Sequence, residues 1–434
     1  MCLVGENMMT MRFVLSLLTV FVLYAPMTVA QDSFEVFQTK SESDIPYRIP
    51  AIAALPDGTV ISVADYRYSR MDIGMVEDGR IDLHVRVSGD GGCSWGDIRT
   101  LIAGKGNESE DFMNVAFGDP CIVADRKTGK LLLISCAGNI SFPKGLRGRH
   151  LGIVCFYSND GGLTWSAPKD VSEPIYEQFD RKKPVRSMFI ASGKIHQSRY
   201  VKKGRYYRLY CSVLVQENAK NRMNHVLYSD DFGQTWSVLG GVETAPIPTG
   251  ADEAKVEELP GGDILISSRT RKGGRMFNIF SFSNKRKATG EWAEMAHSSS
   301  HNNGIVTEDN DCNGELLLVP VIRAEDGRKV SLLLQSAPMG PERTNVGIYY
   351  KTLKSSEDYS SPKQIAENWE GVYQVTDKGS AYSTMIMLPD GMVGFLFEEE
   401  TYCTTTGGGY TIVYERLDVK DITDGKFTAS KARL

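Results

Sequence analysis

Short apolar runs separated by turn residues make up most of the chain after residue 31. Helical periodicity, in which apolar residues recur every three or four positions, is scarce in this part. The clearest apolar runs span residues 131–136, 152–157, 206–215, 263–268, 316–322, 330–334 and 392–397. Turn-forming residues lie between them, and this pattern predicts an all-β sandwich, barrel or propeller.

An internal repeat narrows this choice. The pattern Ser-x-Asp-x-Gly-x-Ser/Thr-Trp begins at Ser88, Ser158 and Ser229, so that successive copies start 70 and 71 residues apart. Each copy follows an apolar run, and repeats of this length predict the blades of a β-propeller. Within a copy the Asp can accept backbone N–H groups, the Gly permits positive φ and the Trp covers the turn. A calcium loop needs more acidic ligands than one Asp per copy, so we expect a structural turn.

The start of the chain differs in composition from the rest. Residues 12–30 begin with Arg12, continue with an apolar stretch and end with small residues, which predicts a secretory signal peptide at residues 1–30. We therefore expect an exported protein, periplasmic or secreted, in which residues 31–434 form one domain. No other stretch is apolar enough to span a membrane. The net charge of −5 argues against a nucleic-acid partner.

The cysteines predict neither a disulfide framework nor a metal site. Seven remain after the signal peptide, and Cys136, Cys155 and Cys211 lie inside apolar runs, which predicts buried thiols. Neither a Cys-x-x-Cys nor a His-x-x-x-His pattern occurs, so we expect no metal and no cofactor.

The stretch from Pro46 to Asp72 gathers charged side chains at one end of a hairpin. Two apolar, β-branched runs flank the turn Pro56-Asp57-Gly58, in which Pro presets φ and Gly tolerates positive φ. Arg48 enters the first strand, and Arg67 and Asp72 follow the second. Two guanidinium groups and one carboxylate therefore lie at the same edge of the predicted sheet.

Later segments add charged and aromatic residues at strand ends. Glu253 and Arg269 lie 16 residues apart on either side of the turn Pro260-Gly261-Gly262, which places both at one edge of a blade. Tyr382 and Glu398 flank a second Pro-Asp-Gly hairpin in the same way. Other residues near these positions are alternatives or further candidates: Asp252, Glu257, Glu258 and Arg271 compete with them, and Asp119 and Arg343 stand beside other strands.

The run Tyr47-Arg48-Ile49-Pro50, the Arg67–Asp72 spacing and the repeated turn resemble bacterial-type exo-sialidases of the Asp-box family. The resemblance extends from Tyr47 to about Glu398, with the motifs in the family's order, and implies a six-bladed β-propeller. It implies catalytic roles for Asp72 as acid/base, Glu253 as base and Tyr382 as nucleophile. It also implies substrate contacts from Arg48, Arg67, Asp119, Arg269 and Arg343, with Glu398 as a supporting carboxylate. Arg48, Arg269 and Arg343 would form an arginine triad, with Arg323 or Arg328 as alternatives to Arg343.

These residue types suit a sialic acid, the sugar that the resemblance implies as substrate. Its carboxylate sits on the anomeric carbon, where three arginines can bind it through charge-assisted hydrogen bonds. The same charge repels a carboxylate nucleophile, whereas a phenol avoids this repulsion but needs a base, because free tyrosine has a pKa near ~10. We therefore expect an exo-α-sialidase that hydrolyses terminal α-linked sialic acids of glycoproteins, glycolipids and oligosaccharides with retention.

Three alternatives stay open at this point. Trans-sialidases that resemble this chain carry a Trp two residues before the third Arg, where this sequence has Pro341. Intramolecular transfer that releases an anhydro-sugar is the second alternative. A non-catalytic sialic-acid-binding propeller is the third, and it would be expected to lose Asp72, Glu253 or Tyr382, all of which are present.

Overall fold

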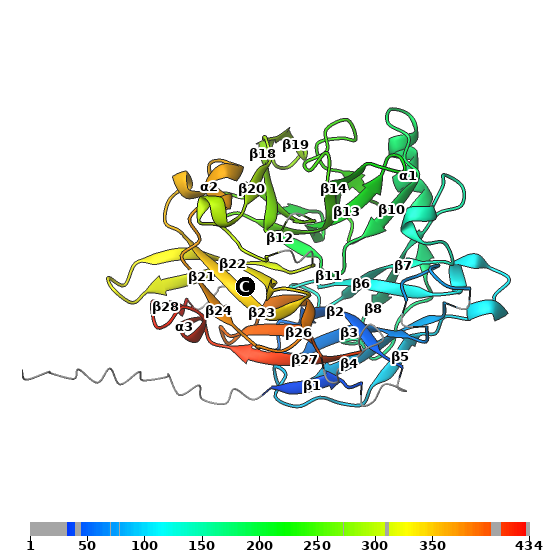
Figure 1. The fold of residues 1–434 in the computed structure, drawn as a ribbon, viewed down its shortest axis with the longest axis horizontal. Coiled ribbons are helices and arrows are strands. Elements are labelled where there is room, and N and C mark those ends of the chain that lie inside the picture. Colours follow the sequence, from blue (N-terminus) through cyan, green and yellow to red (C-terminus); the bar gives the residue numbers. More distant parts are fainter. Residues whose placement is uncertain are drawn as a thin grey trace, which may run out of the picture. The chain divides into compact units, whose positions relative to one another are not determined.

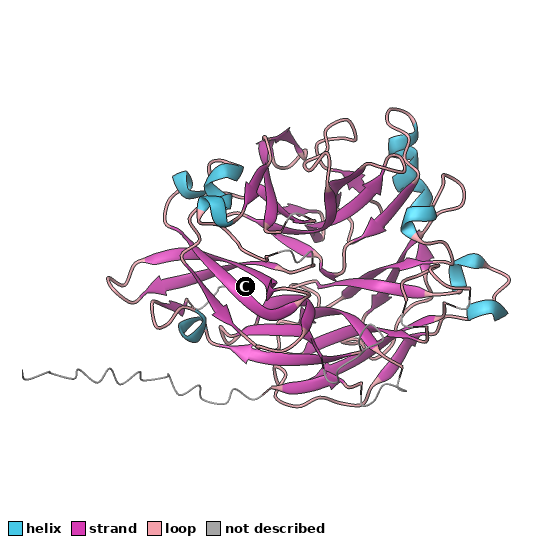
Figure 2. Cartoon of the chain, in the orientation of Figure 1, coloured by secondary structure: helices cyan, strands magenta, loops and turns pink. Residues whose placement is uncertain are grey.

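The computed structural model describes residues 33–39, 45–69, 71–77, 79–271, 273–308, 312–400 and 409–430. The signal peptide predicted at residues 1–30 lies outside these ranges. Strands dominate the described residues, and the helices are few and short (Figure 2). The prediction of an all-β fold is therefore confirmed. Within these ranges, no helix has both the length and the apolar character needed to traverse a bilayer.

The largest sheet joins strands from the two ends of the described chain. Its order is β25-β26-β27-β2-β3-β4-β5, and β1 also pairs with β27. Figure 1 shows β2 and β3 beside β26 and β27. Among the described residues, β2 and β27 pair only at Tyr47 and Tyr410. The strands of this sheet are β1 (Phe34–Phe37), β2 (Tyr47–Ala54), β3 (Val60–Arg67), β4 (Ile81–Ser88), β5 (Arg99–Ile102), β25 (Ser380–Met387), β26 (Val393–Glu400) and β27 (Tyr410–Leu417).

Two five-stranded sheets follow in the chain. The first has the order β11-β6-β7-β8-β9, and the second has the order β10-β13-β14-β15, with β12 also pairing with β13. The first contains β6 (Phe117–Ala124), β7 (Leu131–Ala137), β8 (Gly152–Ser158), β9 (Lys169–Asp170) and β11 (Gly193–Lys194). The second contains β10 (Ser187–Ile190), β12 (His196–Lys203), β13 (Tyr206–Gln216), β14 (Arg222–Ser229) and β15 (Ser237–Val238).

The remaining strands form two further five-stranded sheets. One has the order β16-β17-β18-β19, with β20 pairing with β18, and the other has the order β24-β23-β22-β21-β28. The first contains β16 (Ala251–Glu258), β17 (Ile264–Thr270), β18 (Arg275–Asn284), β19 (Thr289–Trp292) and β20 (Ala296–Ser298). The second contains β21 (Leu316–Arg323), β22 (Lys329–Gly340), β23 (Thr344–Leu353), β24 (Gly371–Gln374) and β28 (Phe427–Ala429).

The helices lie outside the sheets (Figure 2). The α-helices are α1 (Ser172–Asp180), α2 (Pro362–Ala366) and α3 (Val419–Ile422). The described 3-10 helices are η1 (Gly106–Glu108), η2 (Phe112–Asn114), η3 (Phe142–Lys144), η4 (Ser300–Asn302) and η5 (Ser356–Tyr359).

The two Pro-Asp-Gly turns form as predicted. Between β2 and β3, Leu55 N donates to Thr59 O at 2.8 Å, and Gly58 has a φ of +93°. The turn between β25 and β26 repeats this arrangement, with Gly391 at +95°. A side chain would be strained at this φ, so glycine is what permits each tight turn.

The repeated eight-residue pattern is a structural turn, as predicted. Its copies join β4 to β5, β8 to β9 and β14 to β15. In the second copy, Ser158 Oγ and Thr164 N both donate to Asp160 Oδ1, at 2.8 and 2.9 Å. Trp165 Nε1 donates to Gly162 O at 3.2 Å. Hydrogen bonds from Thr164 and Ser158 lower the pKa of Asp160 to about 2.

Apolar side chains fill the space between neighbouring sheets. One cluster contains Leu132 and Cys155 from the β6–β8 sheet and Met188 and Leu227 from the β13–β14 sheet. Similar clusters lie between the other neighbouring sheets. One more joins the two halves of the largest sheet. Cys136, Cys155 and Cys211 are buried thiols, which confirms that prediction.

Candidate active site

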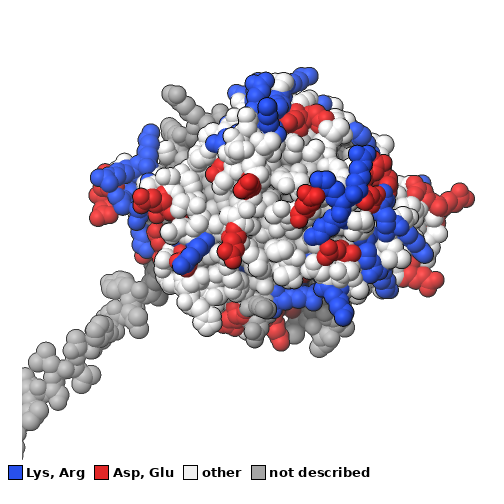
Figure 3. Space-filling model, turned by 90° about the horizontal axis from the view of Figure 1, so that it is seen from above, with Lys and Arg blue, Asp and Glu red and all other residues white. Residues whose placement is uncertain are grey.

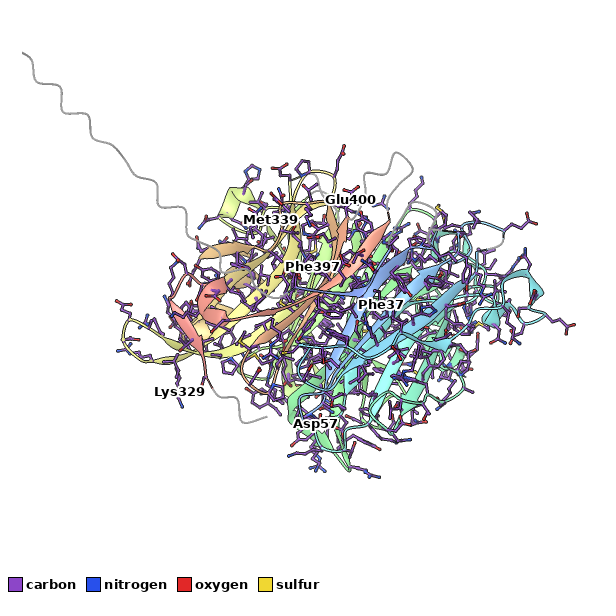
Figure 4. All side chains as sticks on the ribbon, turned by 90° about the horizontal axis from the view of Figure 1, so that it is seen from below. Phe37, Asp57, Lys329, Met339, Phe397 and Glu400 are labelled. Carbon is purple, nitrogen blue, oxygen red and sulfur yellow. The ribbon has the colours of Figure 1, made fainter. Side chains whose placement is uncertain are left out.

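A cavity of about 290 Å³ lies where the predicted site residues meet. Figure 4 places Met339 and Glu400, at the ends of β22 and β26, on one side of the molecule. The turn residues Asp57 and Lys329 lie on the other side. Seven of the nine predicted site residues line the cavity: Arg48, Asp72, Asp119, Glu253, Arg269, Arg343 and Tyr382.

Irregular strand starts bring four of these side chains together. Strands β2, β6, β16 and β25 each lose regular pairing near their first residues, between Arg48 and Ala51, Gly118 and Cys121, Ala251 and Ala254, and Ser380 and Ser383. Such bulges redirect side chains and are common beside active sites. Ile49 and Asp119 have φ values of +56° and +57°, which is strained above all for the β-branched Ile49. Backbone strain is therefore present at the cavity.

Tyr382 and Glu253 line the cavity and contact each other directly. The Tyr382 hydroxyl donates to Glu253, with its oxygen 2.8 Å from Oε1 and 2.9 Å from Oε2. Both side chains are buried, and burial together with the charge of Glu253 raises the pKa of Tyr382 well above its ordinary value. Arg269 Nη1 donates to Glu253 Oε2 at 2.6 Å and lies 3.3 Å from the Tyr382 oxygen. In such a pair the carboxylate can take the phenolic proton.

Glu398 lies behind the cavity and orients Arg48. Its Oε1 accepts from Arg48 Nε at 2.8 Å and from Ile49 N at 2.7 Å. Its Oε2 accepts from Arg48 Nη2 at 3.3 Å and from Tyr382 N at 3.0 Å. Burial lowers the pKa of Arg48, but the Glu398 carboxylate raises it by more. Glu398 thus connects two predicted site residues on different strands.

The three arginines of the predicted triad converge on Tyr382. The Cζ atoms of Arg48 and Arg343 lie 5.6 and 5.9 Å from the centre of its ring, and Arg269 contacts its oxygen. On the face seen in Figure 3, charges of both signs are interspersed. The alternatives Arg323 and Arg328 pair with Asp326 and do not line the cavity.

Asp72 is the exposed member of an acidic group around Arg67. Arg67 is 1% exposed and donates to Asp65 from Nε at 3.0 Å and from Nη2 at 2.8 Å, and it also donates to Asp72. The Asp72 side chain is 72% exposed, and the positive charge of Arg67 lowers its pKa. Arg67 lies beneath the cavity surface and supports Asp72 from behind. Its contact with a substrate stays a prediction.

Asp65 was not predicted as part of the site, although it accepts hydrogen bonds from two residues that were. Its Oδ1 accepts from Asp119 N at 3.0 Å, while its other oxygen pairs with Arg67. Burial raises the pKa of Asp65 to about 6, although Arg67 acts in the opposite direction. Burial and the neighbouring Asp65 raise the pKa of Asp119. The spacing of Asp65 and Arg67 could have revealed this contact, because residues two apart on a strand share a face.

An apolar wall of the cavity was also not predicted. Its side chains come from η3, β10 and β13 and from the residue before β8, and no motif marks them: Phe142, Leu151, Phe189 and Leu214.

Asp252 and Arg222 line the cavity too and pair at 3.5 Å, and Arg271 is a further lining residue. Glu257 and Glu258 lie elsewhere, paired with Arg199 and His196.

Residues 74–395 match the family described as the BNR repeat-like domain. The sialidase of Micromonospora viridifaciens is 29% identical over 373 residues, which cover 82% of this chain and 50% of that protein. The sialidase of Bacteroides fragilis is 25% identical over 395 residues, which cover 87% of this chain and 62% of that protein. The chain therefore spans about half the length of the Micromonospora relative.

Solved structures share the fold. A Hadza microbial sialidase has a TM-score of 0.67 at 20% identity, covering 90% of this chain and 69% of that chain. The intramolecular trans-sialidase from Ruminococcus gnavus has a TM-score of 0.67 at 18% identity, covering 90% of this chain and 98% of that chain. At these identities the likeness shows the fold.

Proposed function

The chain belongs to the BNR repeat-like domain family, and on that basis we propose that it is an exo-α-sialidase. The proposed reaction is hydrolysis of terminal α-linked sialic acids of glycoproteins, glycolipids or oligosaccharides, with retention. The sialidases among its relatives support the class of reaction. The cavity supplies a residue for each step.

The observation that carries this proposal is the Tyr382–Glu253 contact inside an arginine-lined cavity. Free tyrosine has a pKa near ~10 and is a poor nucleophile at neutral pH. Glu253 overcomes this because it can accept the proton while the oxygen attacks. An uncharged phenol also avoids repulsion by the carboxylate of the sugar.

Substrate binding follows from the orientation of the arginines. The C1 carboxylate binds Arg48, Arg269 and Arg343 through charge-assisted hydrogen bonds. Glu398 already holds Arg48 and Glu253 already holds Arg269, so little ordering is needed on binding. Asp119, supported by Arg67, and the apolar wall contact the rest of the sugar.

The first step forms a covalent intermediate. The Tyr382 oxygen bonds to the anomeric carbon, and its proton passes to Glu253. The bond from that carbon to the leaving oxygen breaks, and Asp72 donates the proton that lets the aglycone leave as an alcohol. Arg67 lowers the pKa of Asp72 in the free protein, and the anionic substrate beside it raises that pKa.

The second step hydrolyses the intermediate. Asp72, now a carboxylate, takes a proton from water, and the water oxygen bonds to the anomeric carbon. The Tyr382 oxygen leaves and recovers its proton from Glu253. Two displacements at one carbon give net retention, and neither step uses a metal or cofactor.

The sheets fit a six-bladed propeller, which is part of the proposal. The largest sheet counts as two blades, β2–β5 and β25–β27 with β1, because its halves meet only at Tyr47 and Tyr410 among the described residues. Six apolar clusters support a ring, since each lies between successive blades and one lies between the last blade and the first. Strand β1 then completes the last blade.

The test is to incubate the purified protein with a fluorogenic sialoside and to identify the sugar by NMR. We expect free sialic acid that first appears as the α-anomer. An anhydro-sugar or transfer to added lactose would instead support intramolecular transfer or trans-sialidase activity. Binding without release would support the non-catalytic alternative.

Export is a further part of the proposal, motivated by the apolar run in residues 12–30. N-terminal sequencing of the exported protein should begin at or near Gln31. Residues 13–23 found on soluble protein would contradict export by this route.

A further inference from the structure

Arg275 is a fully buried arginine behind the cavity. It begins β18 and stands directly opposite Arg269 in the pairing of β17 with β18. Its side chain is surrounded by protein, with 1% of the residue exposed. The guanidinium donates to three neutral oxygens: Ser267 Oγ at 3.0 Å, Ser267 O at 3.1 Å and Cys312 O at 3.1 Å.

This set of partners sets Arg275 apart from the other fully buried arginines that the structure describes, Arg67 and Arg208. Arg67 pairs with Asp65 at 2.8 Å, and Arg208 pairs with Asp230 at 2.7 Å. Arg275 forms no ion pair with any described carboxylate. An unpaired charge is costly to bury, so a compensating anion is expected nearby when the protein functions.

The charges around the cavity indicate where that anion binds. Arg48 forms an ion pair with Glu398, and Arg269 forms one with Glu253, so the net charge of each pair is close to zero. An incoming carboxylate therefore meets two arginines whose charges are already offset. Arg275 stands beside Arg269 on the neighbouring strand. The nearby carboxylates Glu253 and Glu315 pair with Arg269 and Lys255, so Arg275 supplies positive charge that no ion-paired carboxylate of its own offsets.

Arg275 is also connected to the cavity through Cys312. The Cys312 carbonyl accepts from Arg275, and its side chain packs with Ile49, Ala381 and Tyr382 beneath the cavity. Burial lowers the pKa of Arg275 to about 10, so the group is a cation at neutral pH.

We propose that Arg275 is a positioning residue that balances the charge of the substrate carboxylate without touching it. The inference rests on the proposed sialidase function. The cation acts through the poorly polarisable interior on an anion that Arg48, Arg269 and Arg343 hold. Because this anion is charged in both the ground state and the transition state, loss of the Arg275 charge should raise KM more than it lowers kcat.

Two ligands separate charge balance from structural support. One is 2-deoxy-2,3-didehydro-sialic acid, which carries the C1 carboxylate, and the other is its C1 methyl ester, which is neutral there. Ligand-observed NMR gives both dissociation constants for the wild type, Arg275→Met and Arg275→Lys. The methionine variant should bind the acid roughly ten- to thirtyfold more weakly, the size expected for one unit charge nearby, while ester affinity changes little. The lysine variant keeps the charge and should bind the acid nearly as well as the wild type.

Arg208→Met is the matched control. Arg208 is equally buried, but it lies near the start of β13, whereas Leu214 on the same strand lines the cavity. Six residues of strand separate these positions by about 20 Å. The control should lower the thermal midpoint and leave both affinities unchanged.

Equal weakening of both ligands by Arg275→Met, or weakening of neither, would overturn the proposal. If that variant does not fold, the neutral variant Arg275→Gln decides: a reduced preference for acid over ester supports charge balance, and an unchanged preference contradicts it. Failure of the wild type to bind the acid would refute the proposed function instead. The two failures are thus distinguishable.

Discussion

The hydroxyl of Tyr382 is shared between both carboxylate oxygens of Glu253, at 2.8 and 2.9 Å. The two residues stand 129 positions apart in the chain and come from β25 and β16. The phenolic proton therefore already points at its proposed acceptor before a substrate binds. We expect the pair to act as one chemical unit.

Substitutions in this pair should be strongly non-additive. Tyr382→Phe removes the nucleophilic oxygen but keeps the ring, so the protein should fold while kcat for a sialyl-oligosaccharide falls by several orders of magnitude. Glu253→Gln should lower kcat nearly as much, because a phenol with a pKa near ~10 then lacks its base. Steady-state kinetics of the double variant should show little further loss.

Covalent labelling gives an independent check of the same pair. A 3-fluorosialosyl fluoride should form a stable bond to the Tyr382 oxygen, which peptide mass spectrometry locates. The Tyr382→Phe variant, which lacks that oxygen, is the control and should stay unlabelled. A label found on Glu253 or Asp72 would reassign the nucleophile.

Glu398→Gln should lower kcat/KM, although Glu398 lies behind the cavity and is not expected to contact the substrate. Gln keeps the shape of Glu398 but loses the charge that holds Arg48 Nε at 2.8 Å. Losing one charge-assisted hydrogen bond costs about 1.5–3 kcal/mol, which corresponds to about a ten- to hundredfold fall in kcat/KM. The neighbouring Glu399 pairs with Lys378 instead, so Glu399→Gln is a matched control that should leave kcat/KM unchanged. Equal effects of both substitutions would argue against this role for Glu398.

Asp72→Asn should distinguish substrates by their leaving groups. Without the acid, an alkoxide must leave unprotonated from natural glycosides, whereas an aryl oxide needs little protonation. We expect kcat for sialyl-oligosaccharides to fall far more than kcat for aryl sialosides. Equal losses on both substrate classes would show that Asp72 is not the proton donor.

The repeated turns should make stability sensitive to acid. Asp160 has a pKa of about 2 in the folded protein, below the ordinary value of about 3.9 for an unfolded chain. Its stabilising contribution is therefore complete above about pH 4 and is lost as the pH falls toward 2. Urea unfolding at pH 5 and pH 3 should show a smaller pH-dependent loss for Asp160→Asn than for the wild type. Glu177→Gln on α1 serves as the control and should lose stability as the wild type does.

Features that depend only on residues close together in the chain could be predicted from the sequence. Gly58 permits its turn through its own φ, and the repeated turns close through hydrogen bonds within eight residues. Tyr382 and Glu253 could be placed at one edge because each stands at the start of a strand that leads into a hairpin. Their direct contact required the arrangement of several sheets.

The burial of a side chain was harder to predict than the element on which its residue lies. Arg67 stands at the end of a strand, where a charged residue is usually exposed, yet it is buried among carboxylates. The apolar wall was missed because Phe142 and Leu214 are ordinary 3-10-helix and strand residues whose role comes only from packing between sheets. Arg275 was missed for the same reason: its neutral partners leave no charge pattern in the sequence.

The pairing of β1 with β27 has a consequence for the order in which the protein can become active. Strand β2, which carries Arg48, is synthesised long before β25 to β27, and contacts between such distant segments form slowly. Until those last strands arrive, β1 has no partner and β2 has an open edge, which invites pairing with other chains. A nascent chain that ends before Tyr410 therefore lacks the strand that joins β2 to β26. In the proposed enzyme, the pairing of Arg48 with Glu398 therefore has to wait until β27 has been made.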